Sequence, residues 1–344
     1  MQVTLFVVAG AFAVSVAVVI ASLGYARRRG LLDQPGQRRS HKRPTPRGGG
    51  IGIVAGVLTC AVPALLLPPR GWPLMAVIVP GCALGMVAAV GWLDDHAAMP
   101  ALPRFLVHLF AATLVGAVLL LPAAEFQPTA WVWLLVLVPV LAGSINAHNF
   151  MDGIDALLAL QALFVLSGDA WMAHDALQPA LMTACLASAA ACAGFLLFNW
   201  PPARIFMGDV GSGTLGLLIA ILAGLLVQRV PTFLWAALIL PSAFLTDAAL
   251  TLLSRVLAGR RWYTAHREHL YQWMTRAGGS HAKTDGAYVA WNLIVVAPAA
   301  WFAARHPESG LALCAVVYVF GAVVWFVGKR ACLSRTRRPG RAVA

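Results

Sequence analysis

Charged residues are scarce in this sequence. Asp, Glu, Lys and Arg make up 11% of its 344 residues, whereas 60% are hydrophobic, and the mean hydropathy is +0.79. Soluble globular domains carry about 25% charged residues. The composition therefore excludes an ordinary soluble globule and predicts an all-α polytopic membrane protein.

Cysteine is sparse as well. The six cysteines show no metal-type spacing and are scattered, mostly inside apolar runs, at Cys60, Cys82, Cys185, Cys192, Cys314 and Cys332. This pattern excludes a disulfide framework and a cysteine-based metal site. We interpret the thiols as small core residues.

Acidic residues number 13 against 25 Lys and Arg, which gives a formal net charge of +12. A basic excess of this kind can indicate nucleic-acid binding. Here, however, the basic residues lie in clusters between apolar runs, a distribution that membrane topology explains better. No nucleic-acid partner is expected.

Eleven apolar runs are long enough to span a bilayer when tilt is allowed, so ten or eleven transmembrane helices are expected. The first run has no basic segment before it and ends at three arginines, which favours a helix over a signal peptide. The runs cover residues 2–25, 49–68, 73–93, 105–122, 130–147, 153–168, 179–199, 211–228, 231–255, 286–304 and 310–328.

Lys and Arg orient these helices. With the N-terminus outside and the C-terminus in the cytoplasm, all basic residues except Arg70, Arg229 and Arg305 fall on the cytoplasmic side. That asymmetry follows the positive-inside rule and puts every polar motif on the same face. Residues 1–328 are expected to form a single integral membrane domain, and residues 329–344 a basic cytoplasmic tail.

Polar side chains recur every third residue between two apolar runs, at Asn146, Asn149, Asp152 and Asp155. Such groups are costly in hydrocarbon and should face a polar cavity. Residues three apart are neighbours on a helix, but the whole set drifts round an unbroken helix, so Asn146 is expected to end the preceding one. Their oxygens suit magnesium, ribose hydroxyls or a base edge. Helix capping explains only one or two of the four.

Two adjacent acids, Asp94 and Asp95, end the third apolar run. Neighbouring carboxylates raise each other's pKa unless a cation neutralises them, so the pair indicates a metal or a lipid phosphate nearby. A solvated helix cap is the alternative. On a helix the two side chains diverge by roughly 100°, which predicts different roles. Arg104 is a candidate positive partner.

A single acid stands among glycines in residues 204–216, which include Gly208, Asp209 and Gly211. Free amides at a helix start favour anions, so this segment predicts a magnesium and pyrophosphate site around Asp209. Glycines also serve close packing of transmembrane helices. Gly208 and Gly211 are therefore interpreted as supporting residues.

The first loop, residues 33–50, is basic and ends in Arg47 and three glycines. Basic side chains near a leaflet attract anionic headgroups, and glycines let backbone amides approach a phosphate. His41 and Arg47 are candidate substrate contacts. The alternative is a positive-inside anchor with no specific ligand.

One acid lies inside the ninth run. Asp247 is either functional or paired with a polar group of a neighbouring helix. The following loop contains His266, Arg267 and His269. The His-x-x-His spacing is compatible with zinc, but no Cys or further His stands close by. Contacts to a phosphate or a sugar are therefore favoured.

The ordered set of motifs resembles the polyprenyl-phosphate N-acetylhexosamine-1-phosphate transferase family, glycosyltransferase family 4, from about residue 31 to residue 272. The histidine motif is similar to the O-antigen and capsule-initiating branch. The likeness rests on Pro-Thr-Pro-Arg-Gly-Gly-Gly, Asp94-Asp95, Asn146-x-x-Asn149-x-x-Asp152-Gly-x-Asp155, Phe206-Met-Gly-Asp209-Val-Gly-Ser, the helix with Asp247, and His266-Arg-x-His269.

The resemblance implies transfer of a sugar 1-phosphate from a UDP-N-acetylhexosamine to undecaprenyl phosphate at the cytoplasmic face of the bacterial inner membrane, with release of UMP. It implies that Asp94, Asp95 and Asp209 are catalytic, and that Asp209 and Asn149 bind Mg²⁺, for which Mn²⁺ can substitute. Asp247, Gly208 and Gly211 would support the site. The implied substrate-binding residues are Asn146, Asp152, Asp155, Arg104, His266, Arg267, His269, His41 and Arg47.

Other interpretations stay open at this level. A lysine often follows the acid pair in relatives, whereas Arg104 is the nearest basic residue here. A peptidoglycan lipid I-forming transferase, a secondary transporter and a membrane scaffold are alternatives, although a transporter should show paired repeats. The donor, N-acetylglucosamine, N-acetylfucosamine or N-acetylquinovosamine, the polysaccharide pathway and a homodimer are also left open.

Overall fold

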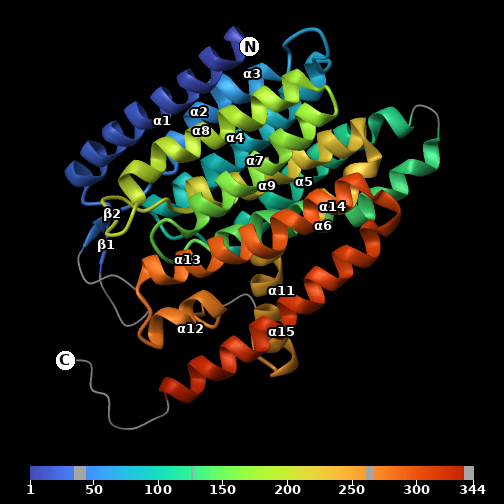
Figure 1. Ribbon diagram of the computed structural model, residues 1–344. Helices are drawn as coiled ribbons and strands as arrows, with labels where there is room; N and C mark the ends of the chain where they lie inside the picture. Colours follow the sequence, from blue (N-terminus) through green and yellow to red (C-terminus); the bar gives the residue numbers. More distant parts are fainter. Residues whose placement is uncertain (35–43, 125–126, 261–265, 337–344) are drawn as a thin grey trace.

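The computed structural model describes residues 1–34, 44–124, 127–260 and 266–336, and these are predominantly helical (Figure 1). The all-α prediction is confirmed. His41 and residues 337–344 lie outside the described residues. In chain order the elements are α1 Gln2–Arg29, β1 Leu32–Asp33, β2 Thr45–Pro46, α2 Ile51–Gly56, a π-helical turn Val57–Ala61, α3 Val62–Ala64, α4 Leu74–His96, α5 Ala101–Ala124, a 3-10 turn Pro128–Trp133, α6 Leu134–Phe150, α7 Leu157–Asp175, α8 Pro179–Asn199, α9 Asp209–Arg229, a 3-10 turn Pro231–Phe233, α10 Leu234–Ile239, α11 Ser242–Leu257, α12 Leu270–Arg276, α13 His281–Trp291, a π-helical turn Asn292–Val296, α14 Ala297–Arg305, a 3-10 turn Pro307–Ser309 and α15 Gly310–Thr336.

The expected transmembrane runs coincide with helices, with some differences in their bounds. Within the described ranges, nine helices are long and apolar enough to cross a membrane, and α10 with α11 makes a tenth if that pair is one span. The second run is a shorter apolar helix, Ile51–Ala64. The ninth run is broken near Pro241, where α10 and α11 meet at 64°. Proline explains the break because it lacks the amide hydrogen of a continuous helix.

Two predicted boundaries differ from the structure. The sixth run was expected from residue 153, but α7 begins at Leu157 because residues 151–156 form a loop. The tail was expected from residue 329, whereas α15 continues to Thr336. The basic residues at the start of the expected tail thus extend a helix.

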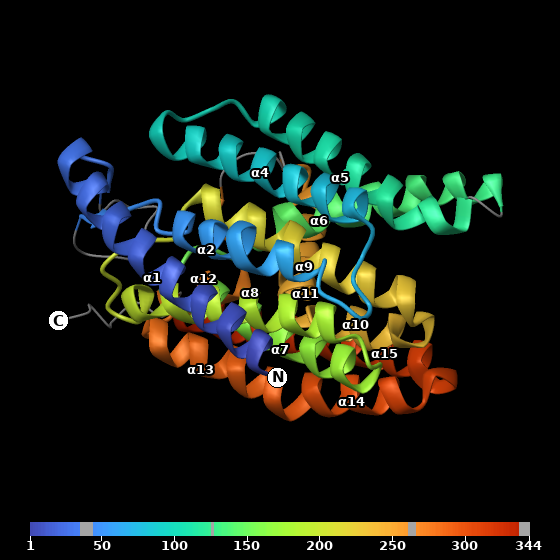
Figure 2. The same cartoon turned by 90° about the horizontal axis from the view of Figure 1, so that it is seen from above.

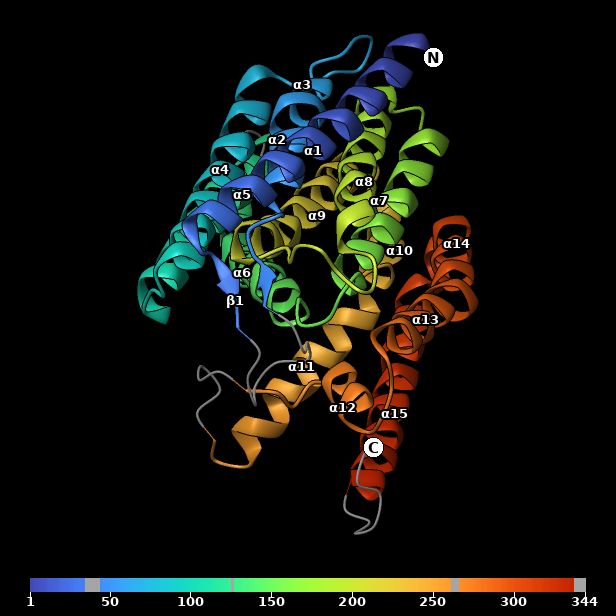
Figure 3. The same ribbon diagram turned by 90° about the vertical axis from the view of Figure 1, so that its left-hand side faces the viewer.

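Helix α9 lies at the centre of the bundle and carries the functional end of the molecule. In an apolar 18-residue stretch of α9, 78% of the residues are buried, against 17% in the corresponding stretch of α1. It packs mainly against α4 and α6, with α7 and α8 beside it and α1 against α8 (Figure 2). Helices α13 to α15 lie to one side of the bundle, and α11 and α12 lie below it (Figure 3). Small residues and the absence of charge between its ends let α9 be enclosed on all sides.

The basic first loop docks onto the loop before α9. Leu32 pairs with Pro46 in the β1–β2 hairpin, and the Pro46 carbonyl accepts a 2.8 Å hydrogen bond from the Phe206 amide. Gly50 meets α9 so closely that an added Cβ would lie 2.5 Å from the Cα of Gly211. This backbone contact fixes Arg47 beside the first residue of α9.

A buried carboxyl group in α7 has no evident role in the site. The side chain of Asp169 is 1% exposed, and neither of its oxygens finds a hydrogen-bond partner among the residues that the structure describes. Gln161, earlier in the same helix, is also buried but accepts a 2.6 Å hydrogen bond from the Asn292 amide. Burial of an unpaired polar group is destabilising.

We expect Asp169→Leu to stabilise the protein. Leucine has the same branched shape, and its two methyl groups replace the two unpaired oxygens, which should gain roughly 1–3 kcal/mol. The thermal midpoint of the purified protein in detergent measures this effect. Gln161→Leu is the matched control and should lower the midpoint, because it breaks an existing hydrogen bond. A lower midpoint for Asp169→Leu would show that its carboxyl group has an unrecognised partner.

Candidate functional site

Asp209 forms the centre of the site because α9 begins there. One oxygen, Oδ1, lies 2.6 Å from Nη2 of Arg47, and the other, Oδ2, lies 2.8 Å from Nη1 of Arg104. The two arginines come from the first loop and from α5, so three distant segments meet at one carboxylate. The prediction that Asp209 stands at a helix start is confirmed.

The adjacent acids Asp94 and Asp95 have different surroundings, as their divergence on a helix predicts. Both lie in the last turn of α4. Asp94 pairs with Nη1 of Arg104 at 2.7 Å and accepts a 2.6 Å hydrogen bond from the Met99 amide. Arg104 is therefore the positive partner of Asp94, as expected, and it links Asp94 to Asp209.

Asp95 is instead built into the fold. Its side chain is 3% exposed, its Oδ1 pairs with Nε of Arg47 at 2.8 Å, and it accepts the amides of Asp209 and Val210 at 2.9 and 3.2 Å. The expectation that free amides at this helix start bind pyrophosphate is thus wrong for these two amides. Asp95 already satisfies them as a cap from another helix.

Gly208 makes that cap possible. Its φ of 80° lies in a region that favours glycine, and an added Cβ would collide with the Asp95 carboxylate. The predicted supporting roles of Gly208 and Gly211 agree with these close contacts.

A polar cavity of about 240 Å³ opens beside Asp209. Asn149, Asp152 and Asp155 from the central motif line it, together with Arg47 and Arg267 from the two basic loops. The predicted convergence of the motifs is therefore correct for these residues. Asp94, Asp95 and Arg104 adjoin Asp209 but are not among the residues of the cavity wall.

The central motif is divided between a helix and a loop. Helix α6 ends at Phe150, so the expectation that Asp152 and Asp155 share a helical face is wrong. Asn149 belongs to the last turn of α6, and its Nδ2 donates a 3.0 Å hydrogen bond to Ser212 Oγ of α9. Asn146 lies in the same helix, as expected, but it does not end that helix, which continues to Phe150.

Asn146 does not join the cavity, contrary to the substrate-binding role expected of it. Its Nδ2 donates a 2.7 Å hydrogen bond to the Ala142 carbonyl of its own helix. Asn146 and Asn149 are three residues apart, which is close to, but not quite, one helical turn. The side chain of Asn146 consequently points in a different direction from that of Asn149.

Asp155 connects the loop after α6 to two other segments. Its Oδ2 accepts the Ala203 amide at 3.1 Å and lies 3.2 Å from His281 Nδ1 at the start of α13. The next residue, Ala156, has a φ of 63° and donates its amide to Asn199 Oδ1 at 2.8 Å. These bonds hold the floor of the cavity in an otherwise strained conformation.

Asp247 is buried in α11 and is not among the residues of this cavity wall. It accepts hydrogen bonds from the Leu270 amide at 2.8 Å, Tyr288 Oη at 2.7 Å and Trp325 Nε1 at 2.9 Å. It thus joins α11 to α12, α13 and α15, which supports the alternative of pairing with polar groups of neighbouring elements. The helix that it caps, α12, brings Gln272 to the cavity.

The two histidines of the second basic loop lie beside each other and beside Phe150 at the end of α6. His269 is 2% exposed, with Nδ1 3.8 Å from Asp247 Oδ1, and its ring stacks at 6.0 Å on Phe150. His266 stacks on His269 at 5.0 Å. Neither histidine is a residue of the cavity wall, unlike their neighbour Arg267. The expected direct contact of both histidines with substrate therefore does not follow from this geometry.

The electrostatic surroundings of Arg47 and Asp152 in the cavity wall shift the pKa values of both groups. Burial opposes the charged form of Arg47, but the carboxylates of Asp95 and Asp209 outweigh it and raise the pKa of Arg47. Burial raises the pKa of Asp152 to about 7, and the negative charge of Asp209 adds to the effect. Asp152 therefore changes its charge near neutral pH.

We expect Asp152→Asn to stabilise the protein more at alkaline than at acidic pH. Because the folded pKa of Asp152 lies above its usual value, the wild type loses stability as pH rises towards about 7, and the loss stays complete above it. The variant avoids this loss. The thermal midpoints of the two proteins should thus differ by more at about pH 8 than at about pH 5. An equal shift at both would contradict the raised pKa.

Several residues of the site were not predicted. Asp33, Asn199, Gln272 and His281 line the cavity, and Ser212 orients Asn149. Gln272 stood next to the recognised histidine motif, which was an available signal. Asn199 ends an apolar run and His281 lies in a short polar segment before one, and nothing local separates either residue from an ordinary helix cap.

The donor atoms suit a partial rather than a complete metal site. Within the four described ranges, no group of three or more His, Cys, Asp or Glu side chains could hold a metal ion. Magnesium needs fewer protein ligands, since one or two carboxylates together with substrate phosphates complete its coordination shell. Asp209 and Asn149 both line the cavity and supply hard oxygens, so they fit such a site.

Comparison with known proteins identifies relatives. The model of the family "Glycosyl transferase family 4" matches residues 77–227, which include Asp94, Asp95, Asn149 and Asp209. The chain is 30% identical to a decaprenyl-phosphate N-acetylglucosaminephosphotransferase of Mycolicibacterium smegmatis, over 88% of this chain and 82% of the relative.

Two further relatives have different names. A probable undecaprenyl-phosphate N-acetylglucosaminyl 1-phosphate transferase of Bacillus subtilis is 30% identical over 73% of this chain and 72% of its own length. A phospho-N-acetylmuramoyl-pentapeptide-transferase of Lacticaseibacillus paracasei is 29% identical over 73% of this chain and 84% of its own. All three relatives are named as transferases of a phosphorylated sugar.

Proposed function

The chain belongs to glycosyl transferase family 4, the polyprenyl-phosphate hexosamine-1-phosphate transferases, and on that basis we propose its reaction. It transfers N-acetylglucosamine 1-phosphate from UDP-N-acetylglucosamine to undecaprenyl phosphate and releases UMP. The observation that carries the proposal is the carboxylate of Asp209, held between Arg47 and Arg104 at the edge of a polar cavity.

The cavity is proposed as the donor site. Its acidic wall, Asp152 and Asp155, can accept hydrogen bonds from ribose hydroxyls or from an N–H of the base, and Oδ1 of Asp155 is buried without a hydrogen-bond partner among the described residues. Arg47 spends two of its N–H groups on Asp95 and Asp209, and the others remain for the donor phosphates. Both the nucleoside and the diphosphate of the donor thus have suitable partners in the cavity.

The opposite side of Asp209 is proposed as the acceptor site. Asp94 and Arg104 lie there, next to the donor cavity but outside its wall. An oxygen of the lipid phosphate attacks the phosphorus attached to the sugar, and the bond from that phosphorus to UMP breaks. Because a phosphate monoester is largely dianionic at neutral pH, the arginines contribute by neutralising charge and aligning the two phosphates.

Mg²⁺ is proposed as the cofactor, with Mn²⁺ able to substitute. Asp209 and Asn149 would hold it, and it would supply positive charge to the donor pyrophosphate. Ser212 has a positioning role in this proposal, because its hydroxyl fixes the amide of Asn149. The orientation of an amide that contacts a metal depends on such outer partners.

The membrane location is proposed in finer terms as well. The protein is a multi-pass membrane protein, and we place it in the bacterial inner membrane with the site facing the cytoplasm. The distribution of Lys and Arg supports that orientation. The lipid-linked sugar would then start an O-antigen or another cell-surface polysaccharide.

A second donor is favoured by a specific observation. The relative from Lacticaseibacillus paracasei is named as a transferase of phospho-N-acetylmuramoyl-pentapeptide at nearly the same identity as the others. A peptidoglycan role therefore stays the alternative. The transporter and scaffold alternatives receive no support, since the relatives reported above are named as transferases.

The test is a donor panel with purified protein, undecaprenyl phosphate and magnesium. UDP-N-acetylglucosamine should give a radiolabelled lipid product and an equal amount of UMP. UDP-N-acetylfucosamine, UDP-N-acetylquinovosamine and UDP-N-acetylmuramoyl-pentapeptide complete the panel. Turnover of the pentapeptide donor alone would overturn the proposal in favour of the peptidoglycan reaction, and no product with any donor would overturn the reaction class.

A further inference from the structure

A second, larger cavity of about 510 Å³ lies between α11, α12, α13 and α15. It is separate from the donor cavity, although α12 contributes to both. Gln272 of that helix lines the donor cavity, whereas Leu270 and Met274 line the larger one. Asp94 and Asp209 are not among the residues that line this second cavity.

The chemistry of this cavity changes along its length. Trp291, Val324 and Trp325 give it an apolar wall at the level of the membrane-spanning parts of α13 and α15. Lys283 lies near the start of α13 and Arg335 near the end of α15, and both also line the cavity. The span formed by α13 and α14 is followed by the antiparallel span of α15, so the start of α13 and the end of α15 lie at the same end of the molecule (Figure 1).

The two cations are available to a ligand. Lys283 and Arg335 are exposed, and within the described part of the chain neither forms an ion pair with a carboxylate. Lys329, which faces the ring of Trp325 at 4.2 Å, adds a third positive charge nearby. A groove that is apolar along the membrane and basic at one end matches a molecule with a hydrocarbon chain and an anionic head.

We propose that this groove binds one anionic glycerophospholipid from the leaflet on the side of the donor cavity. Its phosphate contacts Lys283 and Arg335, and an acyl chain lies along Val324 and Trp291. A basic residue near a membrane surface attracts anionic lipid by about 1 kcal/mol.

The occupant is a structural lipid and not the acceptor of the reaction. An acceptor must bring its phosphate to Asp94 and Asp209, whereas the basic end of this groove is formed by other elements. The bound lipid instead contacts Leu270 and Met274 of α12, and Asp247 ties that helix to Trp325 in the same wall. Its occupancy therefore stabilises the helix that carries Gln272.

The test counts bound lipids by native mass spectrometry. The full-length protein in detergent is titrated with phosphatidylglycerol or with phosphatidylcholine. Val324 lines the groove and is 40% exposed, so Val324→Trp should fill the groove. Val327 lies on the same helix outside the groove and is 62% exposed, so Val327→Trp is the control. We expect Val324→Trp to lose one phosphatidylglycerol that the wild type and Val327→Trp retain.

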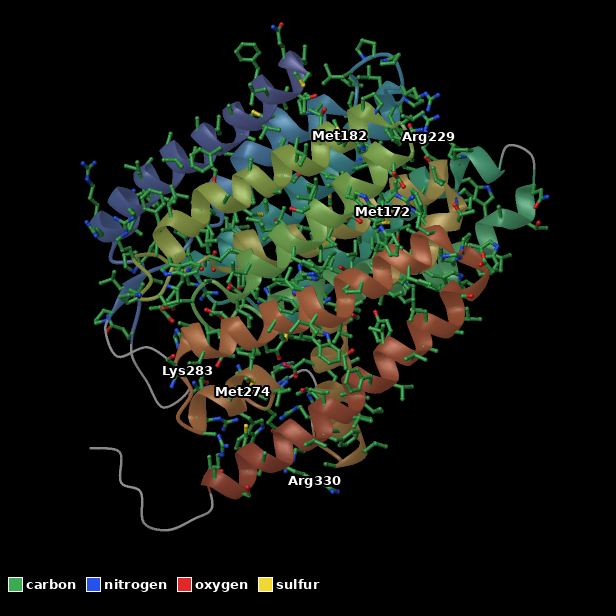
Figure 4. All side chains as sticks on the ribbon, viewed as in Figure 1. Met172, Met182, Arg229, Met274, Lys283 and Arg330 are labelled. Atoms are coloured by element: carbon green, nitrogen blue, oxygen red, sulfur yellow. The ribbon has the colours of Figure 1, made fainter. Side chains whose placement is uncertain are left out.

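A second pair of variants tests the charge. Lys283→Gln and Arg335→Gln should each weaken retention of phosphatidylglycerol roughly fivefold, the equivalent of the attraction per basic residue, and leave that of phosphatidylcholine unchanged. Arg330→Gln, an exposed cation of α15 outside the groove wall, is the control and should have no effect (Figure 4).

Three results would overturn the proposal. Equal lipid retention by Val324→Trp and Val327→Trp would show that the groove is not the binding site. Equal affinity for phosphatidylglycerol and phosphatidylcholine would show that the cations do not select the lipid. Recovery of polyprenyl phosphate, identified by its mass, would assign the groove to the acceptor. Because lipid binding is measured without turnover, none of these outcomes depends on the proposed reaction.

Discussion

Asp209→Asn is expected to reduce turnover by about a thousandfold, the upper range for loss of one charged group that acts on a developing charge. Asparagine keeps the size of the side chain but removes the negative charge that would hold the cation. The initial rate of lipid-linked sugar formation at saturating donor measures the loss. A rate within a few-fold of the wild type would sink the metal assignment of Asp209.

The variant should remain folded. The amide of residue 209 still donates to Asp95, and each arginine keeps one carboxylate, Asp95 for Arg47 and Asp94 for Arg104. Asp175→Asn is the matched control, because it also removes one acid from an ion pair, with Arg305, at the far end of α7. The control should keep full activity, and both variants should keep the thermal midpoint within a few degrees.

Asp95→Ala and Asp94→Asn should separate the roles of two adjacent carboxylates. Removal of the Asp95 side chain leaves Arg47 with one partner and two buried amides with none, which should cost about 3–5 kcal/mol of stability. Asp94 is paired with Arg104 outside the donor cavity. Asp94→Asn should therefore lower turnover about a hundredfold with little loss of stability.

The measurements are thermal midpoints and donor binding alongside the rate. We expect Asp95→Ala to lower the midpoint and to lose donor binding, because Arg47 and the start of α9 are no longer fixed. Asp94→Asn should keep donor binding and lose only turnover. Asp95→Asn should fall between, since its one carboxamide oxygen can accept some of the same hydrogen bonds. Similar loss of stability in Asp94→Asn and Asp95→Ala would contradict the distinction.

The sequence was sufficient for the positions of the helices. Long apolar runs can satisfy their backbone only as helices in a membrane, and each predicted run coincides with a helix. The ends of the helices were harder to predict from the sequence. The ninth run is broken near Pro241 and the last helix continues to Thr336, and a hydropathy pattern alone predicts neither point.

The composition of the site was predicted in part. Acids are rare in this chain, so the pair Asp94–Asp95 and the isolated Asp209 were conspicuous, and topology placed them together. The ion pairs of Arg47 and Arg104 could be anticipated as charge compensation, but only the structure gives the partners. The difference between Asp94 and Asp95 follows from their divergence on a helix.

Other features depend on contacts between distant segments. His281 reaches the cavity because α13 begins beside the loop that contains Asp155. Asn146 faces away because α6 remains helical through it, while Asp152 reaches the cavity because the helix has ended. A three-residue spacing is compatible with both outcomes, and the point at which a helix stops decides between them.

The contact between the first loop and the start of α9 constrains the order in which this protein matures during synthesis. Arg47 and Asp95 are made long before Asp209 and the amides that Asp95 caps. Until α9 leaves the ribosome and inserts, Asp95 can pair with Arg47 and Asp94 with Arg104, but the two backbone amides that Asp95 caps have not been made. The donor cavity is completed later still, because Arg267, Gln272 and His281 of its wall follow α9 in the chain.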